Sequence, residues 1–427
     1  MQQIPVPVER VVGLDVHPDS FTAALVEGPN PRAAIVHKTF DKVPMAQLLS
    51  WTKKHTTPDD LIVLEASGNS FHVARSLMEI GRKVDVLESA HLGKLKEAHA
   101  NNDKISAVRI AKAFLAGTTK SVWIPDAETQ RRRDWNHAHR KAVEQVTRSN
   151  NSLLSYLSDN GVRADKRNLF LKRSLEQNTE WIRSAKQWSP SQWLVIEIQL
   201  HDLHHAMDTR QRWASLIAQE VAQDPILLSL VRLFGVREVV AFALGAVIGD
   251  IHRFADPSKL VSYVGLNPAF DDSGNEKWSG GIGGHGHKGL RTLLIESAHS
   301  LMRSRSPLGD WGRKLLARRG EFKLAVAAVA RKLLTAVWYL LMGRFDAVQE
   351  IPKSLDIKLG VIISHIGKES LDRLNLTRQA LRDQMHQTLK TGRVYVLKPV
   401  RKSPGNQAPK ENTASELEAE LDRVVPA

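Results

Sequence analysis

The stretch "RVVGLDVHPDSFTAALVEG" (residues 10–28) decides the fold, because two β-rich runs flank a short polar turn. A third β-rich run, "AAIVHKTF" (residues 33–40), follows the turn signal "PNPR". The first run ends on a carboxylate, Asp15, at the edge of a predicted strand. A hairpin-like start of this kind predicts a sheet whose strand ends can hold functional side chains.

Helical and β patterns alternate over the next seventy residues. Helical spacing is seen in "MAQLLSWTKKH", "SFHVARSLMEIG" and "KISAVRIAKAFLAG", and short apolar strand patterns in "DLIVLEA" and "KVDVLES". Such alternation is typical of a mixed sheet with helices packed on it. We therefore predict an α/β domain over residues 9–126.

Long helices are predicted over residues 127–223. Apolar side chains recur every three or four residues in 131–161, and a second stripe of this kind follows in 193–221. Narrow stripes on long helices are typical of a helical hairpin or a coiled coil, within one chain or between two. The class of the whole chain is thus α/β followed by α.

The remaining chain is predicted to contain a second compact, mainly helical unit over residues 224–345. Its start, "PILLSLVRLFGVREVVAFALGAVIGD", has the pattern of a helix-hairpin-helix, whose turn amides can meet a phosphate. Residues 346–400 form a mixed C-terminal extension without a clear pattern. Residues 401–427 are polar and are predicted to be a disordered tail.

Composition indicates an anionic partner. Sixty Lys and Arg against 46 Asp and Glu give a net charge of +14 and a pI near 9.8. Lys and Arg that face phosphates release condensed counterions, so a chain this basic is expected to bind a polyanion. The absence of cysteine excludes disulfides and thiolate sites. No signal peptide is recognisable and no apolar run approaches the roughly 20 residues of a membrane span, so we expect a soluble, cytoplasmic protein without membrane contact.

Three acids are candidate metal ligands. Asp15 and Glu65 each end a predicted strand, and Asp103 opens a predicted helix. Clustered carboxylates raise one another's pKa unless a cation lies between them, and Mg²⁺ prefers carboxylate oxygens. An Mg²⁺ site of this kind could polarise a phosphodiester and stabilise the attacking and departing oxygens.

A serine in a glycine-rich segment is the candidate nucleophile. In "DDSGNEKWSGGIGGHGHKG" (residues 271–289) we expect Ser273 to lie in a loop beside Gly274, before six further glycines that let backbone amides approach a ligand. Lys288 and Arg291 add positive charge near the start of the following helix, itself an anion-binding position. A serine beside phosphate-binding amides could form a covalent seryl-phosphate. Tyr263, which is nearby, is expected in the core.

Basic residues on the first long helix are candidate nucleic-acid contacts. Residues 127–173 contain eleven Lys and Arg against five acids, interleaved with Trp135 and two histidines. This composition fits either a solvated face or a helix that meets nucleic acid. The candidate contacts are Arg131, Arg132, Arg133, Arg140 and Lys141, together with Lys288 and Arg291.

Two segments resemble one known family. "GLDVHPDSFTAALVEG", "LIVLEASGN" and "NDKISAVRIA" are similar to the RuvC-like, RNase H-fold domain of the DEDD transposases, site-specific recombinases of insertion sequences. "RFADPSKLVSYVGLNPAFDDSGNEKWSGGIGGHGHKGLRTLLIESA" is similar to the transposase domain of that family. The resemblance covers residues 9–345 in the family's order. Some members of the family are guided by a bridge RNA.

The resemblance implies site residues. Asp15, Glu65 and Asp103 match the first three acids of the family, and Ser273 matches its serine nucleophile. Ser106 stands where the fourth acid is expected, and Asp272 stands where a Gln is common. The implied cofactor is Mg²⁺, with two ions possible and Mn²⁺ able to substitute.

The resemblance also implies partners. They are double-stranded DNA, a guide RNA, and further copies in a homodimer or homotetramer, in which the acid site and the serine combine across subunits. On this reading the long helices over 127–223 are a dimerising element, and their basic faces bind RNA or DNA.

Three alternatives remain open from the residues. A RuvC-like, Mg²⁺-dependent nuclease that hydrolyses branched DNA with water needs the acids but not Ser273. A catalytically impaired nucleic-acid binder would account for Ser106. An actin-like phosphotransferase has a similar strand turn, but the chain lacks the later glycine-rich nucleotide motif expected of one.

Overall fold

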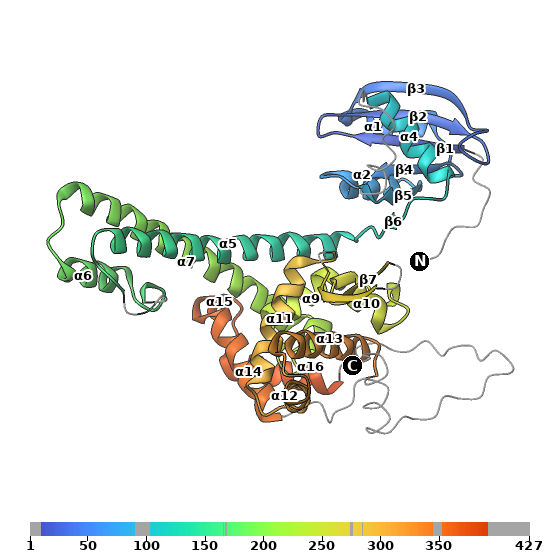
Figure 1. Cartoon of the computed structure of the whole chain (residues 1–427). Helices are drawn as coiled ribbons and strands as arrows, with labels where there is room; N and C mark the ends of the chain where they lie inside the picture. The colour runs from blue at the N-terminus through green and yellow to red at the C-terminus, as the bar shows by residue number, and fades with distance from the viewer. Residues whose placement is uncertain are drawn as a thin grey trace. The chain divides into compact units, whose positions relative to one another are not determined.

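The computed structural model describes residues 10–89, 103–164, 166, 169–273, 276–283, 285–344 and 352–391. The chain divides into two compact units, residues 1–128 and 129–427 (Figure 1). The first unit is a sheet with helices and the second is mainly helical. The predicted fold class is thereby confirmed, while the finer five-segment division stays a prediction.

The first unit is built on a six-stranded mixed sheet in the order β3-β2-β1-β4-β5-β6. β1, β2 and β3 form an antiparallel meander, β4 and β5 continue in parallel with β1, and β6 is antiparallel to β5. The strands are β1 (Arg10–Val16), β2 (Ser20–Glu27), β3 (Ile35–Pro44), β4 (Leu61–Glu65), β5 (Lys83–Leu87) and β6 (Ser121–Val122). β1 to β5 were predicted from the β-rich runs and from the alternation.

Both faces of this sheet are covered. Alternate residues of β1 point to opposite faces, so Val12 and Leu14 pack under one layer and Val11 under the other. The first layer is α1 (Leu48–His55), after the short η1 (Met45–Gln47), and α2 (Ser70–Glu79). The second layer is α4 (Asp103–Leu115). A near-continuous apolar run in β1 follows from burial on both faces.

Gly13 decides where α4 lies. A Cβ on Gly13 would be 2.1 Å from the carbonyl oxygen of Ala107 and 3.1 Å from Cβ of Ala111. Only glycine therefore allows the backbone of α4 to come this close to β1. The glycine fixes α4 against the central strand.

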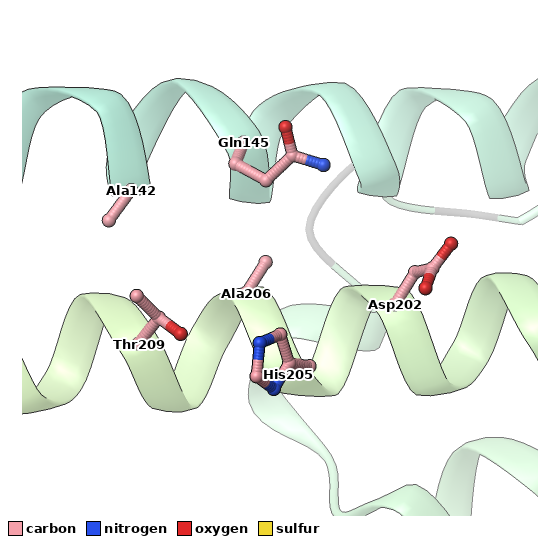
Figure 2. A pocket seen from close by; sticks show the side chains of 6 residues that line it. All are labelled: Ala142, Gln145, Asp202, His205, Ala206 and Thr209. Carbon is pink, nitrogen blue, oxygen red and sulfur yellow. The ribbon is translucent and has the colours of Figure 1, made fainter.

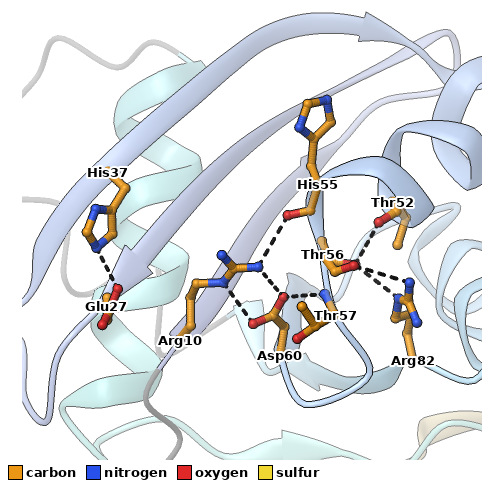
Figure 3. A network of polar contacts seen from close by, with 9 residues as sticks. All are labelled: Arg10, Glu27, His37, Thr52, His55, Thr56, Thr57, Asp60 and Arg82. Atoms are coloured by element: carbon orange, nitrogen blue, oxygen red, sulfur yellow. Dashed lines mark hydrogen bonds and ion pairs between the residues drawn. The ribbon is translucent and has the colours of Figure 1, made fainter.

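A polar network holds the start of β1. Nε and Nη2 of Arg10 donate to the two carboxylate oxygens of Asp60, at 2.8 and 2.5 Å, and the backbone N–H of Thr57 donates to Asp60 as well (Figure 3). Arg82 donates to the hydroxyl and the carbonyl of Thr56. Asp60 is only 4% exposed, and although burial alone would raise its pKa, the bonds from Arg10 and Thr57 bring that pKa below its usual value. These bonds stabilise the end of β1 that lies away from Asp15.

The second unit begins with two long antiparallel helices, α5 (Ala127–Asp159) and α7 (Pro190–Gln223). Their antiparallel course follows from the contacts, since Trp135 packs 6.0 Å from Trp213 and Arg131 pairs with Glu220 at 2.7 Å. Between them lie η2 (Phe170–Lys172) and α6 (Leu175–Ala185). Ser174 and Ser189 start α6 and α7 with capping boxes. The predicted helical stripes pair within the chain.

The rest of the second unit surrounds one large apolar core. This part of the second unit contains one described hairpin, formed by β7 (Pro268–Ser273) and β8 (Glu276–Ile282). Its helices are α8 (Pro225–Leu230), α9 (Glu238–Ile248), η3 (Ile251–Arg253), α10 (Pro257–Val264), α11 (Lys288–Met302), α12 (Pro307–Arg319), α13 (Phe322–Leu341), α14 (Pro352–Ile366), α15 (Lys368–Arg373) and α16 (Arg378–Thr391).

Three expectations need correction or fall outside the structure. Residues 352–391 form three helices, although the sequence of this extension showed no clear pattern. α13 is long and apolar enough to span a membrane by length and composition alone, contrary to expectation, but 78% of its apolar window is buried inside the protein. The predicted tail at 401–427 lies outside the described residues.

Candidate catalytic and nucleic-acid-binding residues

Asp15 and Glu65 lie at the ends of two neighbouring parallel strands. The register of β1 and β4 pairs Gly13 with Val63 and Leu14 with Leu64, so the next residue on each strand is Asp15 and Glu65. Neighbouring strands are about 4.8 Å apart, which brings the two backbones to that separation. Paired residues of parallel strands point to the same face, and here that face is the one covered by α4.

This face is apolar under α4 and becomes polar where the strands end. Val11 and Val63 are fully buried, whereas Asp15 is 20% exposed and Glu65 is half-buried. The polar row continues across the sheet, because Asp15 is paired with Thr22 on β2, whose hydroxyl donates to Asp41 at 3.3 Å. Asp15 therefore lies in a polar row at the edge of the sheet, with Glu65 and Thr22, and not in the apolar core; we call this row the polar margin.

Two loops border the acids. Nε2 of His17 lies 4.0 Å from Oδ1 of Asp15. The amide of Asn69, in the connection from β4 to α2, donates to the carbonyl of His17 at 2.9 Å. Neither side chain was singled out from the sequence. The signal for His17 is its spacing, since a residue two positions after Asp15 continues the same face of the strand.

Asp103 is the first residue of α4, and its backbone alone is described. It precedes by one turn Ala107, whose carbonyl lies against Gly13, and Gly13 shares a face with Asp15. Ser106, at the fourth acid position, is 9% exposed and its hydroxyl accepts a long bond from Arg109 at 3.5 Å. The helix that begins with the third predicted acid thus covers the face on which the first two lie.

The donor set suits a hard cation in its chemistry. Asp15 and Glu65 offer carboxylate oxygens on one face, and Mg²⁺ is commonly held by one or two carboxylates with its remaining positions filled by water and substrate phosphate. Among the described residues no group of three His, Cys, Asp or Glu side chains is close enough to hold a metal. The side chain of Asp103 lies outside that set.

Ser273 ends β7, so the expected loop was wrong. Asp272 pairs with Lys277 and Ser273 pairs with Glu276 across an antiparallel hairpin. The register leaves two residues between the strands, and Gly274-Asn275 is a two-residue hairpin signal that the many glycines obscured. The last residue of a strand is held more firmly than a loop residue. The side chain of Ser273 is outside the described residues.

Two glycines, Gly265 before the hairpin and Gly286 after it, bring two backbone segments together. A Cβ on Gly265 would be 1.9 Å from the carbonyl oxygen of His285, and one on Gly286 would be 2.5 Å from the amide nitrogen of Gly265. Both have positive φ, +79° and +93°. Nη1 of Arg291 donates to the carbonyls of Gly265, Gly283 and His285. Arg291 and these glycines thus fix the base of the hairpin to α10, beside Tyr263.

The start of α11 lies close to α5. Nδ1 of His287 accepts from the N–H of Leu290 and caps the helix. Desolvation lowers the pKa of His287, and the nearby charges of Arg133 and Arg140 lower it further. Lys288 is exposed at the first position of α11. The site therefore gathers positive charge around a histidine that is kept neutral at neutral pH.

Three of the predicted basic contacts lie inside the helical body. Arg131 pairs with Glu220 and lies over the ring of Trp135, and Arg132 pairs with Glu220 and Asp224. Arg133 donates to the carbonyls of residues 246 and 247, at the end of α9. These bonds give the three arginines a structural role in joining α5, α7 and α9.

Arg140 and Lys141 are more open. Both pair with Glu144 on the exposed side of α5, at 3.5 and 3.6 Å. Lys141 also lines a hollow of about 450 Å³ beside α7. A second hollow of about 300 Å³ lies between the same helices (Figure 2), lined by Ala142, Gln145, Asp202, His205, Ala206 and Thr209. None of these six is a predicted site residue, and the hollow has no assigned role.

Two family models match the chain. A transposase model of the DEDD type of IS110 matches residues 12–160, which include nearly all of the acid-bearing sheet and the whole of α5. A second model, described as the transposase IS116/IS110/IS902 family, matches residues 229–310, from the end of α8 into α12. Together the two matches cover just over half of the chain. The chain belongs to the IS110 family of transposases.

Relatives of this transposase are similar over most of its length. A probable family 20 transposase of Pseudomonas aeruginosa is 26% identical over 289 residues, which are 66% of this chain and 84% of the relative. The transposase for insertion sequence element IS1111A of Coxiella burnetii is 25% identical over 337 residues, 78% of this chain and 89% of the relative. That for IS1328 of Yersinia enterocolitica is 21% identical, over 78% of this chain and 96% of the relative. The resemblance inferred from the motifs is confirmed, and with it a transposase activity on DNA.

Proposed function

We propose that this IS110-family transposase cuts and rejoins DNA through a covalent link to Ser273, assisted by Mg²⁺ bound at Asp15, Glu65 and Asp103. The observation that supports the acid site is the register of β1 and β4, which aligns Asp15 with Glu65 on the face covered by α4. The opposite end of β1 is fixed by Arg10 and Asp60, so the strand that bears Asp15 is rigid.

The two carboxylates, with Asp103, would hold the metal. When bound, Mg²⁺ or Mn²⁺ in one or two positions would neutralise charge that develops on the phosphodiester oxygens. The protein's part is to fix Asp15 and Glu65 at adjacent strand ends and to present an open polar margin to DNA. His17, beside Asp15, could move a proton or contact a phosphate there.

The covalent step is a transesterification. The hydroxyl oxygen of Ser273 attacks the phosphorus of one DNA phosphodiester, its own proton is lost, and the bond from phosphorus to one sugar oxygen breaks. That sugar oxygen leaves as a hydroxyl, and the other DNA end remains joined to Ser273 as a phosphodiester. A hydroxyl of a second strand then attacks the same phosphorus, which rejoins the DNA and releases the serine. Each step replaces one phosphodiester bond with another, so no external energy source is required.

Further partners belong to the proposal. We infer double-stranded DNA as substrate, a structured guide RNA that selects the site, and a homodimer or homotetramer in which the serine of one subunit acts with the acids of another. α5 and α7 are the proposed coiled-coil, dimerising element, with Arg140 and Lys141 on its exposed face. Five further basic residues remain proposed contributors to nucleic-acid binding. Lys288 would contact the nucleic acid directly, whereas the bonded arginines would hold the surrounding helices and hairpin in place: Arg131, Arg132, Arg133 and Arg291. The protein would act in the bacterial cytoplasm, on the nucleoid.

One experiment tests the acid site separately from the role of Ser273. The protein is incubated with Mg²⁺, target DNA and its RNA, denatured, and examined for a protein–DNA adduct. Asp15→Asn is expected to abolish cleavage and to leave RNA binding nearly unchanged, because it alters metal coordination and no basic side chain. Cleavage that persists in Asp15→Asn would show that the acid site is elsewhere.

Ser106 supports a second candidate, a weakened member of the family. The residue is 9% exposed and its hydroxyl accepts from Arg109, in the position where a fourth carboxylate is expected. Ser106→Asp adds a negative charge that Arg109 can pair with, so we expect the variant to fold and to cleave DNA at a lower Mg²⁺ concentration. Cleavage rates are measured across a Mg²⁺ titration, with Ser152→Asp, at an exposed position of α5, as the control for an added charge. An unchanged Mg²⁺ dependence would mean that three acids suffice.

A further inference from the structure

Six exposed cations lie on α12 or on the segments directly before and after it. Residues 303–323 contain seven Lys and Arg against Asp310 and Glu321, a net charge of +5 out of the +14 of the chain. Of the seven, Arg313 is bonded internally to the carbonyls of Met302 and Ser304 and to Asp310. The others form what we call the α12 basic surface: Arg303, Arg305, Lys314, Arg318, Arg319 and Lys323.

These six side chains are not neutralised. Within the part of the chain that the structure describes, no ion pair or side-chain hydrogen bond involves any of them. The contrast with α5 is direct, since Arg132 there has two carboxylate partners and is 17% exposed. Exposed like charges that lack carboxylate partners create a positive potential, which favours the binding of an anion.

The backbone of α12, which carries four of these seven cations, is packed rigidly against its neighbours. A Cβ on Gly309 would be 2.3 Å from the carbonyl oxygen of Leu301, and one on Gly312 would be 2.4 Å from Sδ of Met302. α12 therefore packs against α11 and α13 through glycines and through Leu315, which is 6% exposed. Lys314 and Arg318 are four residues apart on the opposite, solvent side. Their positions are fixed by the backbone, although their side chains are free to adjust.

The helix dipole explains only part of this charge. Arg318 and Arg319 lie in the last turn of α12, where a cation is favourable. Arg303 and Arg305 lie before the helix and Lys323 after it, so the dipole gives no reason for them. α12 has one acid, Asp310, which pairs with Arg313 and lies four residues before Lys314, so a single carboxylate stands against the four cations of this helix. The surface has the composition of a phosphate-binding face.

We propose that the α12 basic surface binds the phosphate backbone of duplex DNA that flanks the exchanged strands. The inference rests on the proposed function for the identity of its partner, and it adds a contact surface beyond the acids and Ser273. α11, of 15 residues, runs from the base of the β7–β8 hairpin to Arg303. Its length is on the order of 22 Å, which corresponds to roughly six base pairs of DNA.

The test compares two triple variants of the full chain. Lys314→Gln/Arg318→Gln/Arg319→Gln removes three charges from the surface. The matched control, Lys368→Gln/Arg373→Gln/Arg378→Gln, removes three exposed charges from α15 and α16. Binding to a labelled DNA duplex is followed by fluorescence anisotropy at several NaCl concentrations, and unchanged thermal unfolding confirms that both variants fold.

The α12 variant is expected to bind roughly tenfold more weakly at moderate salt. The slope of log affinity against log salt should fall by about 2.7, because each phosphate contact contributes about 0.9. Hydroxyl-radical protection roughly six base pairs from the cut should be lost as well. An equal loss in the control, or an unchanged slope in the α12 variant, would overturn the proposal.

Other partners are excluded by parallel titrations. A loss confined to a structured RNA of equal length, or to vesicles rich in phosphatidylserine, would also overturn the assignment to DNA. The result is independent of the chemistry, since binding requires neither Ser273 nor the metal. If the wild type forms the Ser273 adduct but the slope is unchanged, this inference alone fails. If the slope falls but no adduct forms, the proposed function alone fails.

Discussion

Glu238 is a buried carboxylate that joins the transposase core to the C-terminal helices. It is 3% exposed, at the first position of α9, and Oε1 lies 2.8 Å from Nδ1 of His365 on α14. Burial raises the pKa of Glu238, but the bond to His365 and the bond to its own backbone N–H lower it more. The same bond raises the pKa of His365 against the effect of burial. The pair is therefore charged on both sides.

The sign of each shift gives a pH window. His365 has a raised pKa, so its contribution to stability is complete below its usual 6.5 and is lost as pH rises through the raised value. Glu238 has a lowered pKa, so its contribution is complete above its usual 4.5 and is lost as pH falls through the lowered value. The pair stabilises the fold most between these two pH values.

His365→Ala is predicted to lower the free energy of unfolding by about 2 kcal/mol in that window, because it leaves a buried carboxylate unpaired. The cost should shrink as the pH rises through the raised pKa of His365, because His365 then becomes neutral in the wild type as well. Thermal unfolding as a function of pH measures it. The control is His386→Ala, whose partner Asp356 is 50% exposed, and whose loss should cost under about 1 kcal/mol. An equal cost of His365→Ala below and above that pKa would contradict the account.

Elements show what the sequence could predict. Apolar periodicity located β1, β2, β4, β5 and the helices α1, α2, α4, α5 and α7, because each buries apolar side chains on a regular face. β3 was located by its β-branched residues after a turn signal, although it is exposed along most of its length. The β7–β8 hairpin was missed because six glycines outweighed a two-residue turn signal. The helices over 352–391 were missed because they are buried against α7 and α8, which are distant in the sequence. Lys358 of α14, for example, donates to the carbonyls of Val231 and Leu233, just after α8. Local pattern does not contain such distant partners.

The candidate site shows the same division. Asp15 and Glu65 could be predicted because both end a buried strand, and parallel strands align their ends. The internal partners of Arg131, Arg132 and Arg133 could not, since these partners lie about ninety or more residues away in sequence. A run of basic residues has the same sequence pattern whether its side chains face solvent, bind nucleic acid or pair with an acid far away in the sequence.

Gly13→Ala tests how α4 is attached to the sheet. The added Cβ would be 2.1 Å from a backbone oxygen of α4, so the helix must shift, at a cost of about 1–3 kcal/mol or more. Because α4 begins with Asp103, we also expect a large loss of metal-dependent cleavage. Gly68→Ala is the control, since a Cβ there meets nothing within 4 Å. Hydrogen exchange of peptides from β1 and α4 should accelerate in the first variant only. Equal exchange in both would contradict the packing argument.

At the scale of the whole molecule, two units contain separate parts of one proposed reaction. The first unit aligns two acids at the margin of a rigid sheet, and the second fixes Ser273 at the end of a strand whose base is tied by Arg291. Neither unit has the complete chemistry on its own. On the proposed mechanism, Ser273 and the metal ligands would meet on DNA for strand exchange, and both parts lie in segments that match models of one transposase family.

The most direct test is to identify the amino acid joined to DNA. The denatured reaction is digested with protease and nuclease, and the nucleotide-linked peptide is sequenced by mass spectrometry. The expected result is a single modified residue, Ser273, in wild type, and no linked peptide in Ser273→Ala or in reactions without divalent metal. A nucleotide on any other side chain, or an adduct that survives unchanged in Ser273→Ala, would contradict it.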